Sequence, residues 1–398
     1  MKRIALLLVS GLTLISLAAC HKDDGPETPS KQDDVASTDE NLAGETVSVG
    51  DFKKLFVLNE GQMGTNNATL DFLRASDGMY VWNAYNQMNP EIPDGLGDVG
   101  NDIAVADNKI WIVVNNSGIV EVADVKNERH IATVSIPTPR QVVIEGNYAY
   151  VTSWNGAYSD YSNPSNSKNP KGVVYKIDTK SYKVIGNVEV GYQPEGLAVS
   201  EGKLFVANSG GISSTLPPTY SYDYTVSIID LTSFKLTRTI EVAPNLKDVF
   251  SDGDGTVYVT SLGNYATAHS GVFAINANKP EGAVRILGGS DEDQYHCSVA
   301  AIDGTRLFVM GTSDEYNWSA TSHKWYLWTV DQGVINDETF AFDGKTPYGL
   351  YAFHERLAVA DAVDYVNPGT VSLYDLSKGK KLWTVRAGVC PGHFAAWK

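Results

Sequence analysis

Hydrophobic and polar residues alternate in short runs along most of the chain, and one block of such runs recurs. A clear copy is PEGLAVSEGKLFVANSG at residues 194–210, where an alternating run, a Glu-Gly turn and a second run follow one another. The second runs of the equivalent blocks are centred on Phe56, Trp111, Tyr150, Phe205, Tyr258, Phe308 and Ala358, so the block repeats every 39 to 55 residues. Period-two alternation over runs this short predicts β-strands.

Each block continues with two further alternating strands. TVSIID ends at Asp230 and is followed by LTRTIEVA; VVYKID and TVSLYD end in the same way at Asp178 and Asp375. We expect these aspartates to bond their own turns rather than to catalyse a reaction. Four short strands in each of seven repeats predict an all-β fold, a seven-bladed β-propeller spanning residues 51–398.

The two ends of the repeat region indicate how the ring closes. The first block begins at Lys54 with a strand of the second type, so it lacks an innermost strand. The chain ends in CPGHFAAWK, which matches the innermost-strand pattern QPEGLAVSE. We therefore expect the C-terminal strand, residues 392–397, to join the N-terminal blade and leave no open sheet edge in the ring.

Insertions are concentrated on one predicted face of the propeller. If the strands of a blade are lettered A to D from the centre outward, the A–B and C–D turns are short, whereas long B–C loops occur at 154–172, 208–224, 262–270, 312–324 and 361–369, and a long D–A loop occurs at 86–102. Insertions on one side of a rigid scaffold are typical of a functional face.

The long B–C loops combine tyrosine and tryptophan with serine, asparagine and glycine, a composition typical of recognition surfaces. Candidate ligand-binding residues are Trp154, Tyr158, Tyr161, Tyr222, Tyr265, Trp318 and Tyr365. The alternative is that some of these rings only pack their own loops, and Tyr220 and Tyr224 are expected to do so.

Residues at the start of the innermost strands are expected to line the central channel. Arg140, His296 and His393 are therefore further candidate ligand-binding residues. The two histidines could hold a metal ion, but we expect polar channel residues bonded to water, and no metal site.

The chain has no H-E-x-x-H, G-x-S-x-G or Walker motif, so no catalytic residues are predicted and the protein is not expected to be an enzyme. Cys297 and Cys390 fall in blades separated by a third blade, too far apart for a disulfide.

The N-terminal residues predict export and a lipid anchor. Lys2 and Arg3 precede an apolar stretch at 4–17, which is too short to span a membrane. Leu17-Ala18-Ala19-Cys20 resembles a bacterial lipobox, which implies removal of residues 1–19 as a signal peptide and lipidation of Cys20. The alternative is an ordinary cleavable signal with a chance cysteine.

Residues 20–50 are acidic and polar, which predicts a flexible tether that carries the lipidated cysteine. Lys22-Asp23-Asp24 resembles the address that sends Bacteroidetes lipoproteins to the outer face of the outer membrane, although such a charge run can also be a solvated spacer. We expect a lipid-anchored protein in the outer membrane that faces the cell exterior. The net charge of −16 makes nucleic acid and anionic lipid headgroups poor partners.

Three segments carry a resemblance to a known group of proteins. LFVLNEGQMGTNNATL at 55–70, YGLYAFHERLAVADAVDYVNPG at 348–369 and the terminal CPGHFAAWK resemble the surface propeller lipoproteins of gut Bacteroidetes, within the wider YncE-like, surface-layer type. That group includes the BtuG-type lipoproteins. The resemblance implies capture of vitamin B12, a corrinoid (cobalamin), at the cell surface and its transfer to a TonB-dependent outer-membrane transporter.

The sequence alone does not identify the ligand. Arg140 could meet the nucleotide phosphate of a corrinoid, or form an ordinary ion pair. A glycan-binding lipoprotein would use the same aromatic rings as sugar platforms. A propeller hydrolase, such as a lactonase, would need a channel cluster built from the two histidines with Asp98, Asp102, Glu195 and Asp248.

Overall fold

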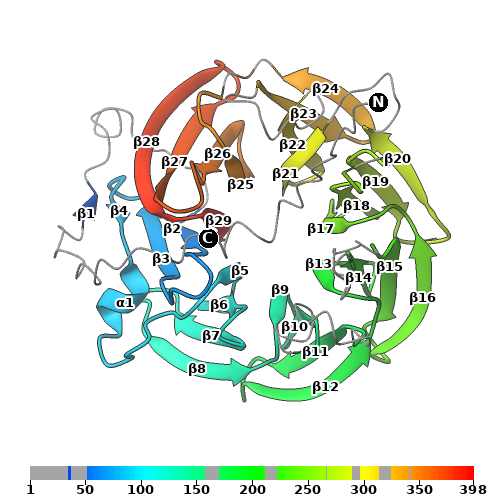
Figure 1. The fold of residues 1–398 in the computed structure, drawn as a ribbon, viewed down its shortest axis with the longest axis horizontal. Coiled ribbons are helices and arrows are strands. Elements are labelled where there is room, and N and C mark those ends of the chain that lie inside the picture. Colours follow the sequence, from blue (N-terminus) through cyan, green and yellow to red (C-terminus); the bar gives the residue numbers. More distant parts are fainter. Residues whose placement is uncertain are drawn as a thin grey trace, which may run out of the picture.

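The computed structural model is a ring of seven β-sheets around a common axis (Figure 1). It describes residues 52–156, 170–210, 222–265, 267–288, 296–312, 324–338, 340 and 342–398, and the backbone of a strand at Val35–Ala36 (β1). The predicted seven-bladed β-propeller is confirmed. One short helix, α1 (Ala84–Met88), lies in the long D–A loop and was not predicted. Within these ranges no helix is long and apolar enough to cross a membrane.

Each blade is an antiparallel sheet whose strands succeed one another from the axis of the ring outward. Blade 1 contains, in that order, β29 (Pro391–Trp397), β2 (Lys54–Asn59), β3 (Thr69–Arg74) and β4 (Tyr80–Val81). Blade 2 contains β5 (Gly100–Ala106), β6 (Lys109–Val114), β7 (Ile119–Asp124) and β8 (His130–Ser135). Blade 3 contains β9 (Pro139–Glu145), β10 (Tyr148–Ser153), β11 (Val173–Asp178) and β12 (Lys183–Glu189). Blade 4 contains β13 (Pro194–Ser200), β14 (Lys203–Asn208), β15 (Thr225–Asp230) and β16 (Lys235–Glu241).

The remaining three blades follow the same order. Blade 5 contains β17 (Leu246–Ser251), β18 (Thr256–Ser261), β19 (Gly271–Asn276) and β20 (Ala283–Leu287). Blade 6 contains β21 (His296–Asp303), β22 (Arg306–Thr312), β23 (Trp325–Asp331) and β24 (Val334–Glu338). Blade 7 contains β25 (Pro347–Phe353), β26 (Arg356–Asp361), β27 (Pro368–Asp375) and β28 (Lys380–Val389).

The C-terminal strand closes the ring as predicted. β29 pairs antiparallel with β2, with Trp397 opposite Lys54, and the Lys53 amide donates a hydrogen bond of 2.6 Å to the Trp397 carbonyl. On the outer edge of blade 1, Val35 of β1 pairs with Val81 of β4, so the segment expected to be a tether adds a short strand there. The predicted signal peptide, Cys20 and the other residues of the tether lie outside the described residues.

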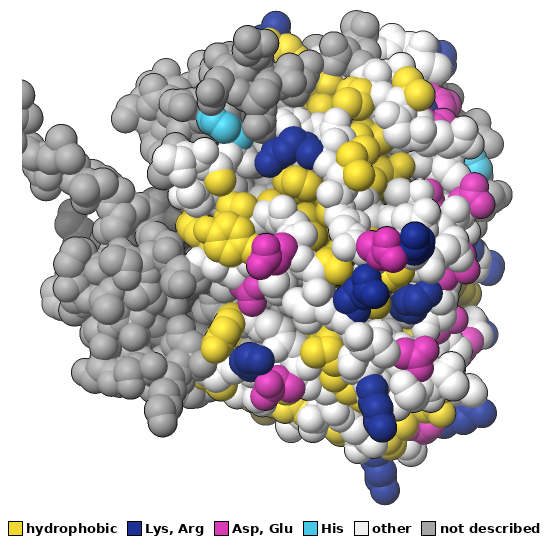
Figure 2. All heavy atoms as spheres, turned by 90° about the vertical axis from the view of Figure 1, so that its right-hand side faces the viewer, with side chains coloured by type: hydrophobic (Ala, Val, Ile, Leu, Met, Phe, Trp, Pro, Cys, Tyr) yellow, Lys and Arg dark blue, Asp and Glu magenta, His cyan; other side chains and the backbone are white. Residues whose placement is uncertain are grey.

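The hydrophobic core lies between neighbouring blades and is built from the alternating residues of the inner strands. Phe56, Trp111 and Phe205, the ring-bearing centres of three second strands, are at most 1% exposed. Burial of one such side chain contributes roughly 1.5–3 kcal/mol. The outermost strands stand at the rim, where Leu236 and Val284 are exposed. Figure 2 shows one side of this rim, on which hydrophobic patches are interrupted by charged and polar side chains.

The aspartates that end the third strands bond their own turns, as predicted. The Asp178 carboxylate accepts hydrogen bonds of 2.7 Å from both the amide and the hydroxyl of Ser181. Asp230 accepts the equivalent pair from Ser233 at 2.7 Å. These short turns therefore fix the face of the ring opposite the long loops.

Candidate functional site

A β-bulge interrupts the pairing of the innermost strand with its neighbour in all seven blades. In blade 7, Pro347 pairs with Asp361 but Gly349 pairs with Ala360, so Tyr348 has no partner of its own. The same register shift occurs in the other six innermost strands: β29, β5, β9, β13, β17 and β21. A bulge leaves a residue unpaired and redirects its side chain. Each bulge directly follows a D–A loop, so the redirected residues gather around the axis at the loop-bearing end of the ring.

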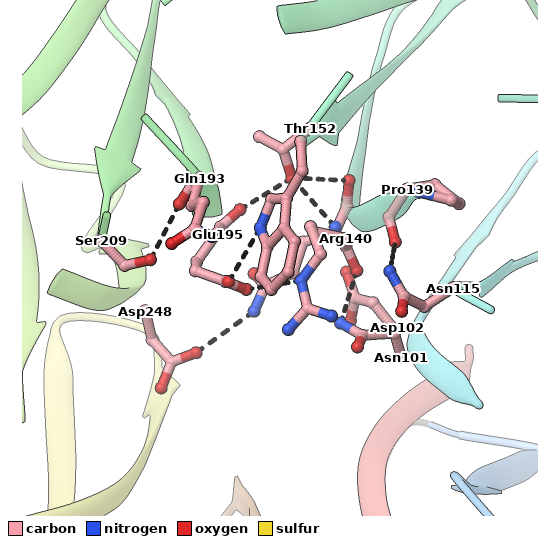
Figure 3. A network of polar contacts seen from close by, with 12 residues as sticks. Asn101, Asp102, Asn115, Pro139, Arg140, Thr152, Gln193, Glu195, Ser209 and Asp248 are labelled. Atoms are coloured by element: carbon pink, nitrogen blue, oxygen red, sulfur yellow. Dashed lines mark hydrogen bonds and ion pairs between the residues drawn. The ribbon is translucent and has the colours of Figure 1, made fainter. Parts of the chain in front are cut away.

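The bulges and one adjoining loop bring polar side chains from several blades together. We call this group the axial cluster; its members are Glu60, Asp102, Arg140, Gln141, Glu195, Lys247, Asp248, Tyr348 and His393. It contains four carboxylates and two permanent cations. Figure 3 shows Asp102, Arg140, Glu195 and Asp248, which come from four successive blades and point toward one another.

Trp154 and Glu195 hold Arg140 in a fixed position. The Arg140 Nε donates a hydrogen bond of 2.8 Å to Glu195 Oε2, and the guanidinium carbon lies 4.8 Å from the centroid of the Trp154 ring. The Trp154 Nε1 donates to Glu195 Oε1 at 3.1 Å. Burial raises the pKa of Glu195, against the effect of Arg140 and Trp154. The structure thus joins two predicted ligand-binding residues, with Trp154 buried and Arg140 in a partly buried ion pair.

Gln141, Lys247 and Asp248 form the next part of the axial cluster. The Gln141 Nε2 donates to Asp248 Oδ1 at 3.2 Å, and the Lys247 Nζ lies 3.7 Å from Asp248 Oδ2. Burial lowers the pKa of Lys247, but nearby groups, Asp248 first among them, outweigh burial and raise it above its ordinary value. Lys247 therefore stays a cation at neutral pH.

His393 lies between two carboxylates. Its Nε2 is 3.3 Å from Glu60 Oε1 and its Nδ1 is 3.7 Å from Asp102 Oδ1. Tyr348 donates a hydrogen bond of 2.7 Å to the other oxygen of Glu60. Burial lowers the pKa of His393, but the hydrogen bond to Glu60 and the charge of Asp102 outweigh burial and raise it. Both ring nitrogens of His393 therefore face carboxylates of the protein.

In the described part of the chain, no group of three or more His, Cys, Asp and Glu residues is placed to hold a metal ion. His296 is the first residue of β21, and its side chain lies outside the described residues. Cys297 and Cys390 are free and buried, and burial raises the pKa of each thiol to about 12.

Asp102 connects the two sides of the axial cluster. Its Oδ2 accepts a hydrogen bond of 2.8 Å from the Val142 amide. Burial raises its pKa to about 6; the charge of His393 opposes this shift and the charge of Asp248 adds to it. Asp98, also considered from the sequence, lies elsewhere: its carboxylate accepts the Gly64 amide and fixes a loop of blade 1.

Two exposed tyrosines, Tyr265 and Tyr365, border the axial cluster. Tyr365 is 46% exposed, and its ring lies 5.6 Å from that of Tyr348 in an edge-to-face contact. Tyr265 is 53% exposed, and its phenol is close enough to Lys247 to affect that residue's pKa. Tyr192, which was not predicted, is also exposed. Tyr222 is half-buried at the base of its loop, where it bridges to Gly210.

The remaining predicted aromatic residues fall into two groups. Tyr158, Tyr161, Trp318 and Tyr220 lie outside the described residues. Tyr224 was expected to pack its loop but is 49% exposed. Asp223 fixes that backbone instead, because its carboxylate accepts the amides of Tyr192 and Tyr224.

Sequence reasoning missed four members of the axial cluster: Glu60, Gln141, Lys247 and Tyr348. Two of them, Lys247 and Tyr348, occupy the second position of an innermost strand, which is the position of Arg140 and Glu195 in their own blades. Aligning the seven repeats on that position would have shown a recurring polar residue there.

Comparisons with known proteins support the fold. The family model described as "Domain of unknown function (DUF5074)" matches residues 53–279, more than half of the chain. No curated protein matches. Among solved structures, hydrazine synthase from Kuenenia stuttgartiensis is similar, with a TM-score of 0.55 and 14% identity over 74% of this chain and 89% of that chain. A functionally unknown protein from Desulfotomaculum acetoxidans DSM 771 has a TM-score of 0.59 and 11% identity over 86% of this chain and 98% of that chain. At such identities the likeness shows the fold alone.

Proposed function

Because this chain belongs to the family described as a domain of unknown function (DUF5074), which leaves the activity open, we propose from the site itself that the protein is a binding protein for corrinoids. The observation that carries the proposal is the axial cluster with exposed tyrosines at its border, all toward the loop-bearing end of the ring. A corrin is a broad ring edged with amides and methyl groups. Tyrosines supply flat contact area for such a ring, and the axial cluster supplies donors and acceptors for its amides.

The proposal extends to the place where the protein works. A lipidated Cys20 would hold the propeller at the outer face of the outer membrane, where it would capture vitamin B12 and pass it to a TonB-dependent transporter. This part is supported by the lipobox, the acidic residues that follow it and the sequence resemblance. The buried thiols and the ion-paired carboxylates of the axial cluster favour binding over catalysis.

Titration of the purified protein with cyanocobalamin, followed by calorimetry or visible absorbance, tests the proposal. We expect binding at micromolar concentration or below. Tyr265→Ala and Tyr365→Ala should each weaken it by about 30-fold if the ring is a central contact, which corresponds to roughly 2 kcal/mol. Lys180→Ala, in a turn of the opposite face, and Lys235→Ala, at the first residue of β16 after the equivalent turn, are the controls and should bind as the wild type does.

Two results would contradict the proposal in different ways. A wild-type protein that does not bind at micromolar concentration is not a corrinoid-capture protein; retardation in an affinity gel that contains a polysaccharide would then identify it as a glycan binder. Variants that lose binding only at Lys180 or Lys235 would place the ligand on the opposite face.

A further inference from the structure

The axial cluster holds more negative charge than its cations balance. Arg140 is paired with Glu195 at 2.8 Å, and Lys247 lies 3.7 Å from Asp248. Glu60 and Asp102 then remain, with only His393 between them. Even with a protonated His393, carboxylates outnumber cations among the described members of the axial cluster.

The carboxylates also act on one another across the axis. Burial is the main reason why the pKa values of Asp102 and Glu195 are raised, and the negative charge of Asp248 adds to both shifts. Asp248 therefore interacts electrostatically with Asp102 and Glu195, which belong to two other blades. A ligand that brought a further anion into this surrounding would add to an existing repulsion.

The axial cluster nevertheless contains hydrogen-bond donors and an acceptor that have no hydrogen-bond partner among the described residues. Only the Nε of Arg140 is used by Glu195; the two terminal amino groups have no acceptor among the described residues. The Oδ2 of Asp248 accepts no hydrogen bond in the described part of the chain, since Lys247 is 3.7 Å away. Figure 3 shows Arg140 and Asp248 turned toward the same space.

The protein's own carboxamide already occupies part of this space. The Gln141 amide donates to Asp248 Oδ1 at 3.2 Å, and the Gln141 residue adjoins Arg140 in the chain. A primary carboxamide both donates and accepts, whereas a carboxylate only accepts. The terminal amino groups of Arg140 and the Oδ2 of Asp248 can therefore bond the oxygen and the nitrogen of an amide. A carboxylate in the same place would be repelled by Asp248.

From this arrangement we infer that the axial cluster recognises a neutral carboxamide of its ligand and rejects a carboxylate at the same place. The inference rests on the proposed function and deepens it, because it names the group by which a corrinoid is held. The amide oxygen accepts from the terminal amino groups of Arg140, and the amide nitrogen donates to Asp248. The ligand's phosphate is then not the partner of Arg140.

Binding of cyanocobalamin and of its separate monocarboxylates, each with one propionamide hydrolysed, tests the inference at neutral pH. We expect at least one monocarboxylate to bind about tenfold or more weakly than cyanocobalamin. Asp248→Asn removes one negative charge from the axial cluster and should reduce that ratio to about threefold or less. Asp107→Asn removes the same charge from an exposed turn of the opposite face and should leave the ratio unchanged.

Every other outcome contradicts a specific part of the inference or of the proposed function. Equal binding of every monocarboxylate, or a ratio that persists in Asp248→Asn, refutes the amide inference while corrinoid capture stands. Dicyanocobinamide, which lacks the nucleotide and its phosphate, should bind within about threefold of cyanocobalamin; its failure to bind would show that the nucleotide is held and would contradict an amide as the main contact. Failure of the wild type to bind any corrinoid refutes the proposed function and the inference together. Melting curves establish that each variant is folded.

Discussion

At the scale of single residues, Asp71 shows what burial does to a carboxyl group in this ring. Its side chain is 1% exposed, and it accepts hydrogen bonds from the Tyr80 hydroxyl at 3.0 Å and from the Asn83 amide at 2.8 Å. Burial outweighs these bonds and raises the pKa of Asp71 to about 6, from an ordinary value of 3.8. The folded protein therefore holds this proton more tightly than the unfolded chain does. The resulting stabilisation is complete below the unfolded pKa and is lost as the pH rises through the folded value.

Asp71→Asn should remove this pH dependence. We expect the free energy of unfolding of the wild type, relative to the variant, to be about 2 kcal/mol higher near pH 4 than near pH 7, because each pKa unit corresponds to about 1.4 kcal/mol and part of the shift lies below pH 4. Urea unfolding of both proteins at the two pH values measures it. Asp254→Asn, in an exposed turn, is the control and should show no such difference. A wild-type advantage that is the same at both pH values would contradict the raised pKa.

Sequence reasoning succeeded at this scale where the partners are local. Asp178 was predicted to close its own turn, and its partner Ser181 is three residues away. The axial cluster could be predicted only in part, because its contacts join distant positions: His393 and Glu60 are separated by 333 residues. The alternation of hydrophobic and polar residues carries no information about which distant polar residues come together when the ring closes.

At the scale of elements, the second strands were predictable and the bulges were not. A buried aromatic residue between two turns identifies a strand, but the alternation looks the same with or without a bulge in its partner. Helix α1 was missed because five residues are too few to show a helical period. The bulges coincide with close contacts between neighbouring blades: a Cβ at Gly349 would lie 2.2 Å from the Gly392 carbonyl oxygen, and one at Gly196 would lie 2.6 Å from that of Lys247.

Gly349→Ala should therefore destabilise the seam between blades 7 and 1. The added methyl group meets backbone that cannot move aside, and overpacking of this kind costs about 1–3 kcal/mol. Gly282→Ala is the matched control, since a Cβ there meets nothing within 4 Å. Guanidinium unfolding should show a lower midpoint for the first variant and an unchanged or slightly higher one for the second. Equal midpoints would mean that the two strands can separate without cost.

At the scale of the whole molecule, the sequence predicted the number of blades, the closing strand and the face that carries the long loops. These follow from the repeat itself, because the first repeat lacks the strand that the C-terminus supplies. What that face binds could not be predicted as well as its position. Exposed tyrosines are typical of binding surfaces, but several predicted ones lie outside the described residues.

The proposed anchor gives a prediction at this scale. Cys20→Ala should move the protein from the membrane fraction to the soluble fraction without changing its melting temperature, because Cys20 lies in the chain well before the ring begins at Lys54. Fractionation of cells with an antibody to the propeller measures the distribution. Protease added to intact cells should digest the wild type if it faces the exterior. A variant that stays in the membrane fraction would show that Cys20 is not the anchor.

The position of β2 also determines how the ring responds to force. The chain runs from β1 on the outer edge of blade 1 to β2, which is hydrogen-bonded to β3 on one side and to β29 on the other. A strand at a sheet edge can be peeled away bond by bond, whereas a strand pulled lengthwise between two partners loads both ladders in shear at once. Tension that reaches β2 along the chain is therefore shared across blade 1. The seam between the two ends of the chain thus serves as a mechanical clamp.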